Sequence, residues 1–140
     1  MEFLILKLRV IILIIDKTEP FIINTFDNYE KLYIKDIYNM YETEPIIFTC
    51  ISEKYLYICL CYEFRGVSKY ILNRVTEREV NKLLNKEITI YDIFAINHMF
   101  RKWKILASRP YEDVFGIGKL TTFEKIKDKL PPKDVYLKYY

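Results

Sequence analysis

The sequence predicts an α+β fold with a central antiparallel sheet of about five strands and three to four short helices. Its length of 140 residues fits a single globular domain over residues 1–140. Apolar residues make up 51% of the chain and aromatic residues 16%, which supplies a core and excludes a disordered chain. Short β-branched segments alternate with helix-start signals, so we expect strands and short helices to mix along the chain.

The first third of the chain predicts two strands and a helix. Residues 3–15 are nearly all leucine or β-branched, with two basic residues of one parity, and predict a strand with one wetter face. Phe21–Phe26 predicts a second strand. Residues 30–41 predict a helix that Pro45 would end, because their apolar side chains recur at helical spacing. These side chains belong to Leu32, Ile37, Tyr38 and Tyr41.

The middle of the chain predicts a β-hairpin followed by a third strand. Residues 46–51 and 55–63 are apolar on both faces, and the polar residues 52–54 join them. A strand that is apolar on both faces is typically covered on both sides, so we expect this hairpin at the centre of the sheet. Val67–Val75 predicts the next strand.

Two short helices should follow. Thr76 and Glu79 form a capping box, in which the two side chains exchange hydrogen bonds with each other's backbone, and this helix should end near Asn85. Thr89 predicts a second short helix, capped through Asp92. The side chains expected to face inward are Val80, Leu83 and Leu84 in the first helix and Ile93, Phe94 and Ile96 in the second.

The last third predicts an extended segment, a loop, a helix and a final strand. Residues 99–107 look extended, and a loop with Pro110 and two glycines follows. Thr121–Glu124 predicts a third capping box, which opens a helix that a Pro-Pro pair would end. The alternating tail Val135–Tyr140 predicts an edge strand.

The charge is unevenly distributed. Residues 16–63 carry four basic and nine acidic residues (net −5), whereas residues 64–140 carry 16 basic and nine acidic residues (net +7). This asymmetry predicts either a polyanion-binding face or two halves whose charges intermix in the fold. Three cysteines at low density indicate a reducing compartment, and the apolar start is interrupted by charge. We therefore expect a cytoplasmic protein that does not bind a membrane.

The order of several short motifs resembles an uncharacterised family of small stand-alone bacterial and phage proteins. The motifs are Ile34-x-x-Ile37-Tyr38, Glu44-Pro45-Ile46-Ile47-Phe48, Tyr55-Leu56, Leu83-Leu84, Ile88-Thr89-Ile90-x-Asp92-x-Phe94, and Leu130-Pro131 with Val135-Tyr136-Leu137. The resemblance covers roughly residues 32–94 and 129–138. It implies a helix, a Pro-started hairpin, a third strand, a short helix and a late short strand, and it implies no activity. This chain departs from the pattern at Asn85-Lys86-Glu87, where a glycine turn is expected.

The catalytic inventory is small. The one histidine, His98, has apolar neighbours and fits a structural role better than acid–base catalysis. Cys50, Cys59 and Cys61 would share one face if the hairpin loop has an even length, and with His98 they could hold zinc, although strand cysteines are mostly inert core residues. Gly116 and the glycine two residues later resemble a phosphate cradle only weakly. We expect no enzyme activity, no metal and no cofactor.

Two segments are candidate binding surfaces. Phe100, Arg101, Lys102, Trp103 and Lys104 combine cations with aromatic side chains. Such a segment suits a protein interface or single-stranded nucleic acid, and alternatively Trp103 belongs to the core and the cations to a solvated edge. The aromatic tail provides the second candidate, which packs either on a partner or on its own domain. Its candidate binding residues are Tyr136, Tyr139 and Tyr140.

These observations favour a small non-enzymatic protein-binding module. The resemblance makes a phage or mobile-element inhibitor or accessory, acting on a host defence complex in an anti-CRISPR-like manner, the specific expectation. The alternative is a nucleic-acid-binding module that uses the basic C-terminal half, with nucleic acid or a ribonucleoprotein as the partner. A homodimer is compatible with either hypothesis.

Overall fold

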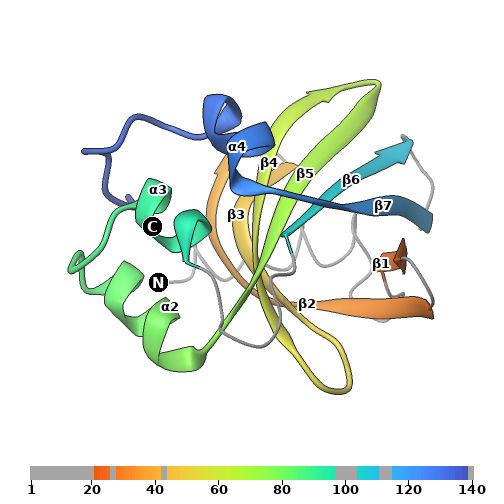
Figure 1. The fold of residues 1–140 in the computed structure, drawn as a ribbon, viewed down its shortest axis with the longest axis horizontal. Coiled ribbons are helices and arrows are strands. Elements are labelled where there is room, and N and C mark those ends of the chain that lie inside the picture. Colours follow the sequence, from red (N-terminus) through yellow and green to blue (C-terminus); the bar gives the residue numbers. More distant parts are fainter. Residues whose placement is uncertain (1–20, 26–27, 42–43, 97–103, 111–114, 139–140) are drawn as a thin grey trace, which may run out of the picture.

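A computed structural model describes residues 21–25, 28–41, 44–96, 104–110 and 115–138 (Figure 1). Its seven strands form one closed barrel in chain order, β1 to β7. Neighbouring strands are antiparallel, except that β1 pairs with β7 in parallel. The strands are β1 (Phe21–Thr25), β2 (Asn28–Tyr41), β3 (Glu44–Ile51), β4 (Leu56–Arg65), β5 (Val67–Val75), β6 (Lys104–Pro110) and β7 (Phe115–Thr121). The predicted antiparallel sheet with short helices is therefore present, with more strands than the expected five.

Strand β2 occupies the segment for which the sequence predicts a helix, and that prediction is wrong. Leu32, Ile34 and Ile37 all pack on the inner face of the sheet, although a regular strand would turn residues 34 and 37 to opposite faces. The register shifts by one residue between Ile34 and Asp36, because Lys35 is an extra, bulged residue. The bulge moves the inward side from even to odd positions, so Ile34 and Ile37 share the inner face at the three-residue spacing of a helix.

The hairpin β3–β4 and the next strand, β5, confirm the sequence prediction for the middle of the chain. Ile51 pairs with Leu56, so the loop between them has four residues. Strand β4 carries inward-facing Tyr57 and outward-facing Ile58, both fully buried. The hairpin is covered on both faces, as its two-sided apolar pattern predicts.

Two capping boxes begin helices α2 (Glu77–Leu84) and α3 (Ile90–Ala95). In α2, Thr76 and Glu79 exchange the two expected hydrogen bonds, and Asn85 ends the helix. The turn that follows has Lys86 at a positive φ of 59°, with the Glu87 amide bonded to the carbonyl of Lys82. This left-handed position after a helix is usually glycine, and it coincides with the expected glycine turn.

The last third of the chain departs from the prediction at three points. Strand β7 (Phe115–Thr121) replaces the predicted loop. By contrast, β6 (Lys104–Pro110) confirms the predicted extended conformation for residues 104–107. Helix α4 (Phe123–Ile126) starts at Thr122 without a side-chain cap, and a 3-10 turn (Lys127–Lys129) follows it. The described tail, residues 135–138, is not a strand, although its Leu137 is fully buried.

The core has two layers, divided by the sheet. The inner cluster includes Phe48, the three cysteines, Tyr57 and Ile105. The outer cluster joins Ile58, Leu60 and Ile71 to the apolar faces of α2, α3 and α4. These helices gather on one side of the sheet in Figure 1. The sheet therefore presents one helix-covered outer face, and the candidate site lies at the border of this cover.

Candidate functional site

Two bulges in β2 form one side of a groove on the outer face of the sheet. The pairs Ile34–Cys50 and Asp36–Thr49 enclose the extra residue Lys35. A second shift lies between Ile37 and Asn39, where Tyr38 is the extra residue. Lys35, Asp36 and Tyr38 all line the groove. Bulges re-aim side chains that a regular strand would place elsewhere, and here they direct a cation, an anion and a phenol to one place.

Thr49 holds the first bulge in position from the neighbouring strand. Its hydroxyl oxygen accepts a hydrogen bond from the Asp36 amide at 3.1 Å and lies 3.5 Å from the Asp36 carbonyl oxygen. Thr49 is 1% exposed, so this polar group forms part of the groove's buried floor. Burial raises the pKa of the Tyr38 phenol, a hydrogen bond with Thr49 lowers it, and the negative charge of Asp36 raises it. Tyr38 therefore stays neutral at physiological pH.

Helix α2 forms the opposite wall. Glu77, Val80, Asn81 and Leu84 lie three to four residues apart and share one helical face. Together with Leu56 of β4 and the residues from β2 and β3, they enclose a cavity of about 400 Å³. We call this cavity the α2 groove. Its volume is within the range of about 300–1,000 Å³ that is typical of small-ligand sites, and it suits one or two side chains of a partner.

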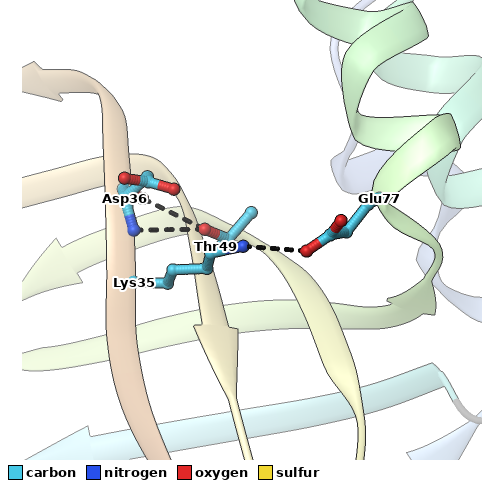
Figure 2. A network of polar contacts seen from close by, with 4 residues as sticks. All are labelled: Lys35, Asp36, Thr49 and Glu77. Carbon is cyan, nitrogen blue, oxygen red and sulfur yellow. Dashed lines mark hydrogen bonds and ion pairs between the residues drawn. The ribbon is translucent and has the colours of Figure 1, made fainter.

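An ion pair joins the two walls of the α2 groove. The Lys35 Nζ atom lies 3.3 Å from Glu77 Oε1, and Figure 2 shows the lysine reaching from β2 toward the start of α2. The two side chains are 39% and 79% exposed. Exposed pairs of this kind contribute little to stability, so the contact can open at small cost.

The groove also contains polar side-chain groups without a hydrogen-bond partner among the described residues. Within the described residues, no side chain is hydrogen-bonded to the Asp36 carboxylate or to the Asn81 amide. Both residues are exposed. Water therefore satisfies these groups in the free protein, and a partner could replace that water.

An exposed apolar row continues from the groove. Tyr33 of β2 pairs with Ile51 of β3, and Ile51 pairs with Leu56 of β4. Side chains of directly opposite residues share a face, and Ile51 shares its face with Thr49 of the groove floor. Tyr33 is 39% exposed and Ile51 40%. The apolar surface of the groove is thus extended across three strands.

The residues predicted to bind a partner fall into three groups. Phe100, Arg101, Lys102 and Trp103, like Tyr139 and Tyr140, lie outside the described residues. Tyr136 is exposed, as a surface role requires. Lys104 is 2% exposed and donates to the Ile96 carbonyl at 2.9 Å, so its ammonium does not belong to an exposed binding surface.

The three cysteines share the inner face of the sheet, as an even-length loop predicts, and all are free thiols. Burial raises the pKa of the Cys59 thiol well above its ordinary value, and its contact with Cys50 raises it further. A buried thiol of this kind is a poor nucleophile and a poor metal ligand. His98 lies outside the described residues, and within them no group of His, Cys, Asp or Glu could hold a metal ion.

A second surface combines lysines with aromatic rings near α4. The Lys129 ammonium lies 5.8 Å from the ring centroid of Tyr62, and that of Lys133 lies 5.4 Å from Tyr91. Tyr91 also meets Phe123 edge to face at 5.2 Å. Both lysines of this basic–aromatic cluster belong to the basic half of the sequence, whereas Tyr62 lies in the acidic segment, and the predicted binding residues include none of them.

The sequence contained only part of the signal for the α2 groove. The capping box at Thr76 places Glu77 in the first turn of α2, but the bulges of β2 leave no pattern in the sequence that shows which of its residues face the groove.

None of the helices in the described ranges has the length and apolarity that a membrane crossing requires. No family model, curated protein or solved structure matches the chain.

Proposed function

We propose that the chain is a small non-enzymatic protein-binding module that takes a segment of a partner protein into the α2 groove. The observation that carries the proposal is the groove itself: a cavity of about 400 Å³ with the exposed Asp36 and Asn81, continued by the apolar pair Tyr33 and Ile51. Polar groups around an accessible apolar surface are the usual composition of a protein interface.

The chemistry of the described residues supports a binding role over catalysis. The cysteines are buried in the inner cluster, where burial keeps the Cys59 thiol protonated. In the groove, Glu77 is paired with Lys35, and Tyr38 has a raised pKa. An activated nucleophile needs a lowered pKa, whereas the pKa values of Cys59 and Tyr38 are both raised.

A narrower form of the proposal concerns the partner. We propose a host defence complex as the target and a phage or mobile-element inhibitor or accessory as the role of this chain. This form rests on the sequence resemblance and on no contact of the groove.

Affinity purification with matched variants tests the proposal. The tagged chain is passed through a lysate of the cell in which it acts, alongside Asn81→Trp, which fills the groove. Arg78→Trp adds the same ring to an exposed position of α2 that does not line the groove. We expect the wild type and Arg78→Trp to capture a partner protein in stoichiometric amount, and we expect Asn81→Trp to lose that partner. Capture by all three proteins would exclude the groove as the site, and capture by none would overturn the protein-binding role.

The basic–aromatic cluster supports a second candidate function, single-stranded nucleic-acid binding. Lysines beside aromatic rings can contact phosphates while bases stack on the rings. Fluorescence anisotropy with a labelled single-stranded DNA and RNA should then show affinity that falls with salt. Replacing Lys129 and Lys133 with glutamine should lower the slope of log affinity against log salt by about 0.7 per lost contact. No binding at low salt would exclude this candidate.

A further inference from the structure

We propose that the α2 groove recognises a basic side chain, arginine above all, that lies next to a large apolar side chain in the partner. This inference rests on the proposed function and adds the chemical class of the segment that the groove accepts. It follows from the charge of the groove, from a cation that already occupies part of it, and from the apolar surface beside it.

The charge of the groove favours a cationic ligand. Its lining residues include two carboxylates, Asp36 and Glu77, and one ammonium, Lys35. Lys35 pairs with Glu77 at 3.3 Å. Among the described residues, no cation pairs with Asp36, so the groove retains one uncompensated negative charge.

Lys35 acts as an internal substitute for the partner's cation. Its ammonium shows that a positive group reached from the β2 side fits beside the Glu77 carboxylate (Figure 2). Because the pair is exposed and weak, an arriving cation can displace Lys35. Lys35 therefore competes with the partner, and its removal should strengthen binding. A residue with a purely structural role would have the opposite effect or none.

Arginine fits the donor and acceptor pattern better than lysine. Its planar guanidinium can donate to two acceptors at once, and the groove offers the Asp36 carboxylate together with the Glu77 carboxylate or the Asn81 amide oxygen. The aliphatic stem of arginine can pack on Val80 and Leu84 of the same wall while its charged end stays near solvent.

The apolar row explains the second part of the recognised segment. Tyr33 and Ile51 are exposed cross-strand partners, and Leu56 links them to the groove. An apolar side chain beside the arginine would cover this row. A dipeptide of one apolar and one basic residue is thus the smallest unit that touches both parts.

The test uses two neutral-capped dipeptides and the isotope-labelled full-length chain. N-acetyl-leucyl-arginine amide is compared with its citrulline analogue, which has the same shape without the charge. We expect the arginine peptide to shift the backbone NMR signals of Asp36, Thr49 and Asn81 in a saturable way, and the citrulline peptide to bind at least about fivefold more weakly. Equal binding of both peptides, or shifts confined to other parts of the chain, would overturn the inference.

Three variants sharpen this experiment. Asp36→Asn should lower the affinity for the arginine peptide by about fivefold, whereas Lys35→Gln should raise it by about twofold to fivefold. Glu53→Gln, which removes an exposed carboxylate of the hairpin loop that does not line the groove, is the matched control and should leave binding unchanged. If Lys35→Gln weakens binding, the inference is wrong. If Asn81→Trp loses the captured partner protein but Asp36→Asn still binds it, the proposed function stands and the recognition of a cation is wrong.

Discussion

The Lys104 ammonium and the Asn73 side-chain amide meet over the end of helix α3, with Nζ 3.4 Å from Oδ1. Asn73 donates to the carbonyl oxygens of Ile93 and Ile96 at 2.9 and 3.1 Å, and Lys104 donates to Ile96 as well. Both side chains are 2% exposed. They satisfy carbonyls that a helix leaves without partners at its C-terminus, and a cation is favourable there. Lys104, which the sequence predicts to belong to a binding surface, thus caps the C-terminus of helix α3.

Removal of the Asn73 amide should destabilise the protein. Asn73→Ala takes away two donors to buried carbonyls and an acceptor for Lys104, which should cost about 2–3 kcal/mol. Urea unfolding followed by circular dichroism measures this free energy. Asn81→Ala, an exposed asparagine of α2, should change it by less than about 0.5 kcal/mol. Equal effects of the two substitutions would contradict the capping role of Asn73.

The bulge at Lys35 should depend on the hydroxyl of Thr49. Thr49→Val keeps the shape of the side chain but loses the acceptor for the Asp36 amide, and we expect a loss of about 1–2 kcal/mol in urea unfolding. Thr49→Ser retains the hydroxyl and should retain the NMR signal positions of Lys35 and Asp36. If Thr49→Val leaves those signals in place, the hydroxyl does not hold the bulge.

Lys86→Gly should stabilise the protein. Lys86 has a φ of 59°, which is unfavourable for a side-chain-bearing residue and suits glycine after a helix. The expected gain is about 0.5–1 kcal/mol after the added flexibility of the unfolded chain is subtracted. Lys82→Gly, inside helix α2, should instead lose about 1 kcal/mol of stability. Thermal unfolding of both variants at one protein concentration gives the comparison, and a lower melting temperature for Lys86→Gly would refute the prediction.

The three thiols should be unreactive until the protein unfolds. Dithiobisnitrobenzoate at pH 8 should modify Cys50, Cys59 and Cys61 slowly in the native protein and rapidly in urea, because all three are buried. The folded pKa of Cys59 is raised above its unfolded value. Its contribution to stability is complete below the unfolded pKa of about 8.5 and is lost as the pH rises toward the folded pKa. Stability should therefore decline above about pH 8.5, and rapid native modification would contradict the burial.

Leu137 should anchor the tail. Its side chain is fully buried in the outer cluster. Two hydrogen bonds hold the backbone on either side of it. The Asn39 side-chain amide donates to the Lys138 carbonyl at 2.8 Å, and the Ile90 backbone amide donates to the Val135 carbonyl at 3.2 Å. Leu137→Ala should cost about 2–3 kcal/mol in urea unfolding. Tyr136→Ala removes an exposed neighbour and should cost less than about 0.5 kcal/mol. Similar values for both would mean that the tail contributes no core packing.

Local signals in the sequence were sufficient for several elements. The capping boxes at Thr76 and Thr89 begin helices because their side chains bond to amides only three residues away. The hairpin of residues 46–63 and the strand Val67–Val75 follow from β-branched residues, a short polar loop and two-sided apolar faces. Such contacts lie within a few residues along the chain and therefore leave a readable pattern.

The tertiary structure alone decided the conformation of residues 30–41 and the composition of the α2 groove. The extra residues Lys35 and Tyr38 are defined only by pairing with β3, and the bulges they create convert strand spacing into an imitation of helical spacing. Lys35 and Glu77 are 42 residues apart in sequence, and Lys104 and Asn73 are 31 apart. Whether a charged side chain forms a surface ion pair or caps a buried helix depends on the residues that the fold brings next to it. Those residues are distant in the sequence, so the residue type alone does not predict them.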